Sequence, residues 1–155
     1  MGQSWHCACS LTSVGANDFT DLTAWQLAER LRLFMKGITS RPAVARSYKY
    51  CAQANDAAES APRNIAEGFG RFAPRQNASF VRIAIASEFE TKNHILKVAA
   101  DGLITATERD AGVLLTHRAS TAAIRYRKYL RSTRAEENAK RIEQRQMEND
   151  EPLNP

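Results

Sequence analysis

The chain has 155 residues, which leaves room for one ordinary domain with a single core. Hydrophobic residues make up 43% and charged residues 25%, close to the averages for soluble globular proteins, so neither a fibre nor a chain disordered throughout is expected. Lys and Arg outnumber Asp and Glu by 22 to 17, a net charge of +5. This excess suits phosphate polymers or acidic partners, although solubility alone also accounts for a charge of this size.

The N-terminal residues 1–17 are expected to form a flexible leader before the domain. They lack the basic start and sustained apolar core of an export signal, and no apolar run in the chain approaches the roughly 18 residues that cross a bilayer. We therefore expect a cytoplasmic protein with no membrane contact. His6, Cys7 and Cys9 offer three ligands to a soft metal, but a closed zinc site needs four, so no metal or other cofactor is expected.

The first predicted helix opens with Asp21 as N-cap and ends near Gly37. Apolar residues follow at helical spacing, which predicts one buried stripe. Its members are Leu27, Leu31, Phe34 and Ile38, broadened by Trp25, Ala28 and Met35.

The second predicted helix begins with Thr39 or Ser40 as its cap and places Pro42 in the first turn, where a missing N–H is harmless. Pro62 lies late in this helix. Either the helix is kinked there or it restarts with Ser60 as a cap, and we favour the kink. The predicted inner face is small: Val44, Tyr48, Cys51 or Ala52, Ala58 and Ile65.

The stretch "SAPRNIAEGFGRFAPRQ", residues 60–76, then forms a corner. It is not a Walker-type phosphate loop, because Lys and Ser or Thr do not follow its second glycine and no strand precedes it. Gly68 and Gly70 are predicted to end the helix, with positive φ where the chain reverses.

The third helix is predicted over residues 77–101, with Gly102 as its stop. Its inner stripe is Phe80, Ile83, Ala84, Ser87, Thr91, Ile95 and Val98. A weak capping box, Thr107 with Asp110, is predicted to open the fourth helix. The inner stripe of that helix is Val113, Leu114, His117, Thr121, Ile124 and Leu130.

Four helices with short connections predict an all-α domain over residues 18–130, an antiparallel up-and-down four-helix bundle. Residues 131–155 are too polar to bury a face of their own. They are expected either to extend the fourth helix or to remain irregular, with about the last ten residues mobile.

Three motifs carry a resemblance to a known family: "DFTDLTAW", "SAPRNIAEGFGR" and "FVRIAIASEFET". The chain resembles the bacterial 23S rRNA intervening-sequence proteins from Asp18 to Leu130. That resemblance implies a four-helix bundle that assembles into a ring, a homopentamer. The family is similar in turn to the accessory variability proteins of diversity-generating retroelements, which implies binding of nucleic acid and of a reverse transcriptase. Ala86 and Lys92 depart from the family pattern, which usually has glycine and glutamate there.

The polar residues of the middle motif share one helical face, because Asn64, Glu67 and Arg71 lie three and four positions apart. They are candidates for a ligand site, but a structural role is favoured: Glu67 pairs with Arg71 or Arg82, and Asn64 bonds the backbone near Pro62. The resulting structural signature is Pro62, Asn64, Glu67, Gly68, Gly70 and Arg82.

No catalytic site is predicted. A di-iron bundle needs Glu-x-x-His on two helices, whereas Glu90 and His94 are one residue too far apart and the pattern has no second copy. His117 falls on the predicted inner face of its helix, where a lone histidine is usually a core residue. We therefore expect no enzyme.

Basic residues are the better indication of function. The stretch "RYRKYLRSTR" interleaves Tyr126 and Tyr129 with cations, a combination that suits phosphates and unstacked bases; the alternative is a solvated face with a tyrosine packed inside. The predicted nucleic-acid-binding residues are Arg125, Arg127, Lys128 and Arg131 here, and Arg63, Arg71 and Arg75 at the corner.

The sequence thus predicts an oligomeric accessory protein that binds RNA or DNA. The basic cluster of the fourth helix is expected to contribute more to this binding than the corner arginines. The alternative is a ring-shaped protein-interaction scaffold without nucleic-acid contact. Because the core is thin, Phe19, Trp25 and Phe69 are expected near subunit contacts.

Overall fold

The computed structural model describes residues 16–71 and 73–150, and over these ranges the chain is all-helical with no β-strand. This confirms the predicted all-α class. The elements in chain order are η1 (Phe19–Asp21, a 3-10 turn), α1 (Thr23–Thr39), α2 (Pro42–Ala45), α3 (Tyr48–Phe69), α4 (Pro74–Ala100), α5 (Ala106–Leu130) and α6 (Thr133–Asp150).

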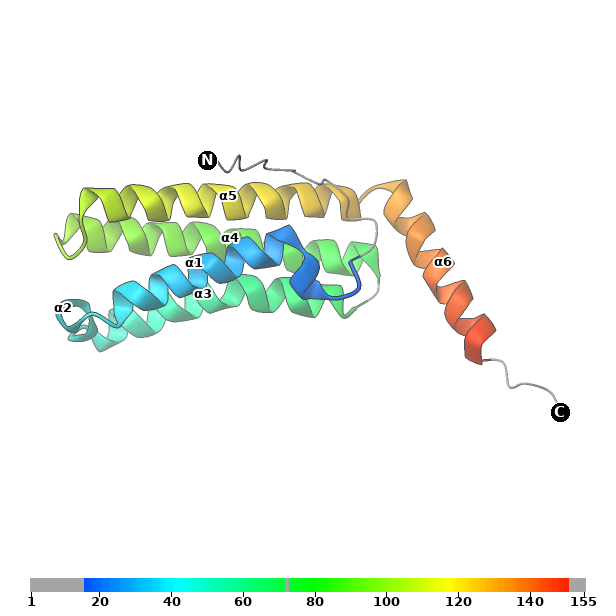
Figure 1. Ribbon diagram of the computed structural model, residues 1–155, viewed down its shortest axis with the longest axis horizontal. Helices are drawn as coiled ribbons and strands as arrows, with labels where there is room; N and C mark the ends of the chain where they lie inside the picture. The colour runs from blue at the N-terminus through cyan, green and yellow to red at the C-terminus, as the bar shows by residue number, and fades with distance from the viewer. Residues whose placement is uncertain (1–15, 72, 151–155) are drawn as a thin grey trace, which may run out of the picture.

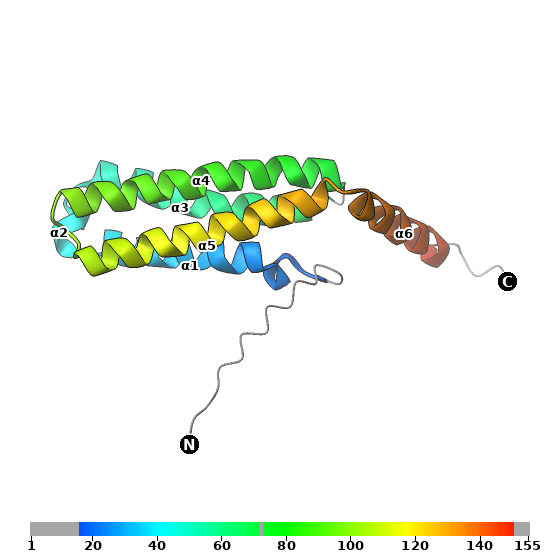
Figure 2. The same ribbon diagram turned by 90° about the horizontal axis from the view of Figure 1, so that it is seen from above.

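Four long helices lie side by side and run in alternating directions (Figures 1 and 2). Each packs against two neighbours, in the order α1, α3, α4, α5 and back to α1, so α1 and α4 are diagonally opposed. We call these four the helical body. Helix α2 forms the turn between α1 and α3, and α6 projects away from the end of the body. None of the helices in the described ranges is long and apolar enough to cross a membrane.

The start of the first helix differs from the prediction. Asp21 is not its N-cap; it belongs to η1, where Asp18 is the cap and the two side chains form a reciprocal capping box. Helix α1 begins at Thr23 and continues through Gly37 to Thr39. The predicted end near Gly37 is wrong because a single glycine inside a helix lowers its stability without stopping it.

The second predicted helix is two separate helices, α2 and α3. Thr39 and Ser40 do not cap a second helix, since their hydroxyls donate to the Lys36 carbonyl at the end of α1. Pro42 does open a helix, as predicted, but α2 ends at Ala45 and α3 begins only at Tyr48. Tyr48 was expected on the inner face and is instead 83% exposed.

Helix α3 continues through Pro62 and does not restart at Ser60. The Ser60 hydroxyl contacts the next long helix instead, accepting a hydrogen bond from Ser87 Oγ of α4 at 2.8 Å. Asn64 Nδ2 donates to the Ser60 carbonyl at 2.7 Å, which confirms the predicted backbone bond next to Pro62.

The two corner glycines do not adopt positive φ. Gly70 is the C-cap of α3 with φ −69°, and Gly68 lies buried inside that helix. Among the glycines in the described ranges, Gly102 alone has positive φ, at 70°. There the N–H of Gly102 donates to the Ala99 carbonyl and that of Leu103 to the Val98 carbonyl, so the predicted stop of α4 is confirmed as a Schellman motif.

The inner face of α4 follows the predicted stripe except at Ile83, which is exposed. Phe80 is half-buried. The buried residues of α4 are Asn77, Ala78, Val81, Ala84, Ser87, Glu88, Thr91, Ile95 and Val98.

Helix α5 is rotated relative to the prediction. Its cap is Thr105 with Glu108, two residues before the expected Thr107 with Asp110. Leu114 and Ile124 were expected inside but are 58% and 51% exposed, and His117 is also exposed. Small residues face the core instead and let α5 approach its neighbours closely: Gly112, Thr116, Ala119, Ser120 and Ala123.

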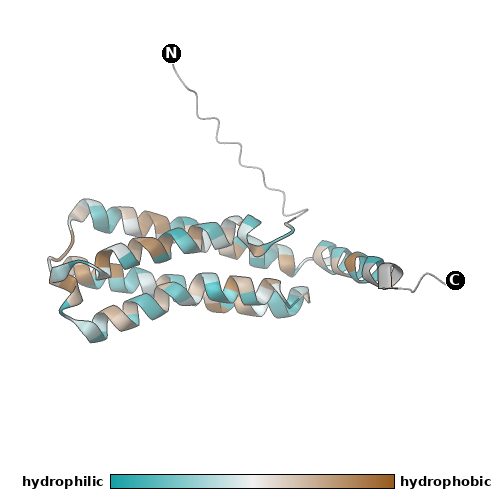
Figure 3. Ribbon diagram, turned by 60° about the horizontal axis from the view of Figure 1, so that its bottom comes forward, coloured by the Kyte–Doolittle hydropathy of each residue, from teal (hydrophilic) through white to brown (hydrophobic). Residues whose placement is uncertain are grey.

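The helix is interrupted at the end of the helical body. Helix α5 ends at Leu130, with Arg131 as its C-cap, so the fourth long helix does not extend into the tail. The tail forms the separate helix α6, whose surface is mostly hydrophilic (Figure 3). Residues 1–15 and 151–155 lie outside the described ranges, and so do His6, Cys7 and Cys9.

Candidate nucleic-acid interface

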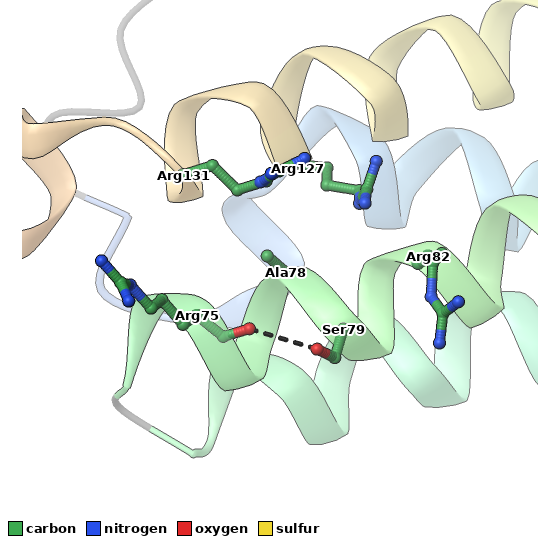
Figure 4. Close-up of a pocket in the computed structure, with 6 residues that line it drawn as sticks. All are labelled: Arg75, Ala78, Ser79, Arg82, Arg127 and Arg131. Carbon is green, nitrogen blue, oxygen red and sulfur yellow. Dashed lines mark hydrogen bonds between the residues drawn. The ribbon is translucent and has the colours of Figure 1, made fainter.

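Four arginines line a groove between α4 and α5, at the end of the body next to α6 (Figure 4). Its volume is about 440 Å³. Helix α4 contributes Arg75 and Arg82, which lie seven positions apart and so share one helical face. The end of α5 contributes Arg127 and Arg131, four positions apart. We call this the arginine groove; its remaining lining residues are Ala78 and Ser79.

A second hollow of about 470 Å³ adjoins the groove over the end of α5. It shares Arg127 and Arg131 with the arginine groove and adds Lys128, Ile124 and Ser132. The basic surface therefore continues around the end of α5, where the exposed Ile124 lies among the cations.

The charge of the groove is largely uncompensated. Arg75 Nε donates to Glu136 Oε1 of α6 at 2.9 Å, an ion pair open to solvent. Within the described residues, no ion pair is found for Arg82, Arg127 or Arg131. The Nε of Arg127 is buried and has no hydrogen-bond partner there. A recess with several unpaired guanidinium groups has a positive potential that attracts anions.

The two tyrosines of the fourth-helix cluster face the core, as the alternative interpretation held. Both are half-buried against the core residues near this end of the body. The Tyr126 hydroxyl accepts a hydrogen bond from Asn77 Nδ2 of α4 at 2.8 Å, and burial raises its pKa to about 12. The Tyr129 hydroxyl accepts one from Asn138 Nδ2 of α6 at 3.1 Å. Their rings therefore anchor helices and do not form a platform for bases.

The other predicted basic residues lie outside the groove. Arg125 is exposed on α5 and Arg63 is exposed on α3, and neither lines either hollow. Arg71 pairs with Glu67 at 2.7 Å, as predicted, and its guanidinium lies 5.3 Å from the centre of the Phe80 ring. The corner set is therefore divided: Arg75 belongs to the groove and Arg71 braces the corner.

Two further titratable groups have buried polar atoms for which the described part of the chain offers no hydrogen-bond partner. Glu88 on α4 is fully buried, neither carboxyl oxygen has a partner in the described part of the chain, and burial raises its pKa to about 8. His94 is half-buried, its ring meets that of Tyr50 edge to face with 5.5 Å between centroids, and burial lowers its pKa. No group of three metal-ligating side chains occurs among the residues that the structure describes.

Residues 20–121 match the family model described as 23S rRNA-intervening sequence protein, which is more than half of the chain. The chain belongs to this family. No curated protein matches it significantly. The 23S rRNA-intervening sequence protein match includes Arg75 and Arg82 but ends before Arg127 and Arg131. One wall of the arginine groove thus lies inside the region that defines the family, and the other lies beyond it.

Arg82 was predicted as part of the structural signature and not as a groove residue. Its seven-residue spacing from Arg75 was a usable signal, because both must lie on one side of α4. The short connection between α4 and α5 was a second signal. It makes the two helices antiparallel, so the start of α4 lies against the end of α5, where Arg127 and Arg131 are found.

Proposed function

We propose that this 23S rRNA-intervening sequence protein is a non-enzymatic accessory protein that binds RNA or DNA through the arginine groove. One observation supports this most directly: four arginines from two helices line one recess, and only Arg75 of the four has an acidic partner in the described ranges. Guanidinium groups bind phosphate oxygens with two parallel hydrogen bonds, which suits them to a phosphate backbone.

The proposal includes assembly. We expect the helical body to act as the up-and-down four-helix bundle of a homo-oligomeric ring, a homopentamer in the cytoplasm. Large apolar side chains exposed on the body support this, because a monomer gains nothing by hydrating them. They include Phe89 and Leu96 on α4 and Leu114 and Ile124 on α5. A ring would repeat the arginine groove by symmetry and multiply its phosphate contacts. A reverse transcriptase is a candidate partner of such an assembly.

The same exposed apolar side chains favour a second candidate, a ring-shaped protein-interaction scaffold without nucleic-acid contact. In that case Leu114 and Ile124 would contact a partner protein, and the arginines would serve solubility alone. The two functions differ in one measurable property, since only the first predicts salt-sensitive binding of nucleic acid.

Fluorescence anisotropy with labelled RNA and DNA, over a series of salt concentrations, tests the proposal. Binding should be present at low salt and weaken steeply as salt rises, because each phosphate contact releases condensed counterions. Replacing Arg82, Arg127 and Arg131 by glutamine should flatten the salt slope by about one unit for each arginine–phosphate pair that the variant can no longer form. Arg63→Gln is the matched control, since it removes an exposed arginine outside the groove. Absence of binding at low salt would reject the proposal and leave the scaffold.

A further inference from the structure

We propose that the arginine groove holds the sugar–phosphate backbone of a nucleic-acid duplex and does not read unstacked bases. This inference rests on the proposed function and narrows it to one class of ligand. The observations that carry it are the side chains that line the groove and the aromatic rings that face away from it.

No aromatic ring is among the described residues that line the groove. Tyr126 and Tyr129, the nearest on α5, are turned to the core and hydrogen-bonded through their hydroxyls to Asn77 and Asn138. The ring of Phe80 on α4 is covered by the guanidinium of Arg71. Proteins that bind single strands stack successive bases on aromatic side chains, and this groove offers no such surface.

The groove offers guanidinium groups and small side chains instead. Arg127 lines the groove and has no ion-pair partner within the described ranges, so its guanidinium is available to an oxygen from outside. Ala78 and Ser79 keep the α4 wall low between Arg75 and Arg82. The sugar–phosphate backbone of a nucleic acid can therefore approach the helix. The strong donors there are guanidinium groups, which bind phosphate oxygens well.

The two helices that carry the arginines are also joined beside the groove. Asn77 of α4 and Tyr126 of α5 are joined by a 2.8 Å hydrogen bond between the same two helices that carry the arginines. A rigid pair of walls suits a rigid ligand, because a flexible strand loses conformational entropy when its phosphates are aligned. A duplex also has a higher charge density than a single strand, so each contact releases more counterions.

The test compares probes with equal numbers of phosphates in an anisotropy assay at low salt: an RNA hairpin, a DNA hairpin and single-stranded oligouridylate. We expect the duplex probes to bind at least about tenfold more tightly than the single strand. Two hairpins of unrelated sequence should bind within about twofold of each other, because phosphate contacts carry no sequence information.

The double variant with Arg82→Gln and Arg127→Gln should remove most of the preference for duplex, whereas Arg63→Gln should retain it. Circular dichroism melting of each variant establishes that the fold is intact. Equal or tighter binding of oligouridylate by the wild-type protein would overturn the duplex inference and leave the proposed function standing. Absence of binding to all three probes at low salt would overturn both.

Discussion

Gly68 of α3 lies directly against Asn77 of α4. A Cβ atom added to Gly68 would lie 2.7 Å from Asn77 Oδ1 and 2.9 Å from Phe80 Cβ, closer than packed atoms approach. Asn77 in turn donates to the Tyr126 hydroxyl of α5. The glycine therefore sets how closely α3 meets α4, next to the hydrogen bond that joins α4 to α5 beneath the arginine groove.

Replacing Gly68 by alanine should destabilise the protein by about 1–3 kcal/mol, because the new methyl group forces two packed helices apart. Urea unfolding followed by circular dichroism measures the change. Gly37→Ala is the control: it also lies inside a helix, but its added Cβ has nothing within 4 Å, so a gain of about 0.5–1 kcal/mol is expected. Unchanged stability of Gly68→Ala would show that α3 and α4 adjust without cost.

The buried Glu88 should make folding stability fall as pH rises from about 4.5 to about 8. Over this window the unfolded chain has released the Glu88 proton while the folded protein, whose pKa is raised to about 8, still holds it. The free energy of unfolding should therefore decrease by on the order of 1 kcal/mol per pH unit. Denaturant unfolding at a series of pH values measures the slope.

The wild-type slope also contains a contribution of opposite sign. Burial lowers the pKa of His94, so this group adds stability as pH rises from its lowered pKa toward the ordinary value of 6.5, above which the gain levels off. The informative quantity is therefore the difference between wild type and Glu88→Gln, which cannot ionise. Glu143→Gln, at an exposed position of α6 far from His94 in sequence, is the control for loss of a surface carboxyl and should retain the wild-type slope. Parallel curves for wild type and Glu88→Gln would mean that Glu88 is solvated.

Thr105→Ala should destabilise the protein by about 1 kcal/mol, because the Thr105 side chain accepts from the Glu108 backbone N–H at the start of α5. Thr107→Ala should change little, since Thr107 lies within the first turn and not at the cap. Thermal melting of both variants checks the helix start. The reverse ranking would restore the cap at Thr107 that the sequence suggested.

Removing the carboxylate of Glu136 should strengthen nucleic-acid binding at the arginine groove. Glu136 pairs with Arg75 and competes with phosphate for it, so Glu136→Gln should lower Kd by a few-fold at low salt. Glu137→Gln removes the same charge from a neighbouring position and measures the general electrostatic effect. If both variants bind alike, the pairing with Arg75 has no specific influence.

Serine in place of both Phe89 and Leu96 should weaken self-association. The two side chains are 51% and 43% exposed, and their seven-residue spacing puts them on one face of α4. Light scattering should return an oligomer for the wild type and smaller species for the double variant. Leu33→Ser is the control, since Leu33 is similarly exposed on α1, diagonally across the body. A wild-type monomer at micromolar concentration would contradict assembly altogether.

Local signals in the chain predicted the features that depend on a residue and its near neighbours. Helical periodicity predicted the all-helical class, Pro42 marked the start of α2, and Gly102 marked the end of α4. The pairing of Glu67 with Arg71 also followed from spacing alone, because residues four apart on a helix are neighbours. These features could be predicted since backbone geometry within one helix is known in advance.

Which face of a helix is buried could not be predicted where both faces carry apolar residues. On α5 the large side chains Leu114 and Ile124 looked like the core stripe, yet Ala119 and Ala123 are buried there. The difference arises because packing density, and not hydrophobicity alone, selects the inner face when helices approach closely.

The sequence by itself determined that this protein is helical, basic and rich in arginine at two separate places. Only the tertiary structure decided that Arg75 and Arg82 share a groove with Arg127 and Arg131, and that Tyr126 points away from it. The physical reason is that these residues are about fifty positions apart along the chain. Their proximity depends on how α4 and α5 rotate against each other, and small contacts such as Gly68 with Asn77 set the packing around them.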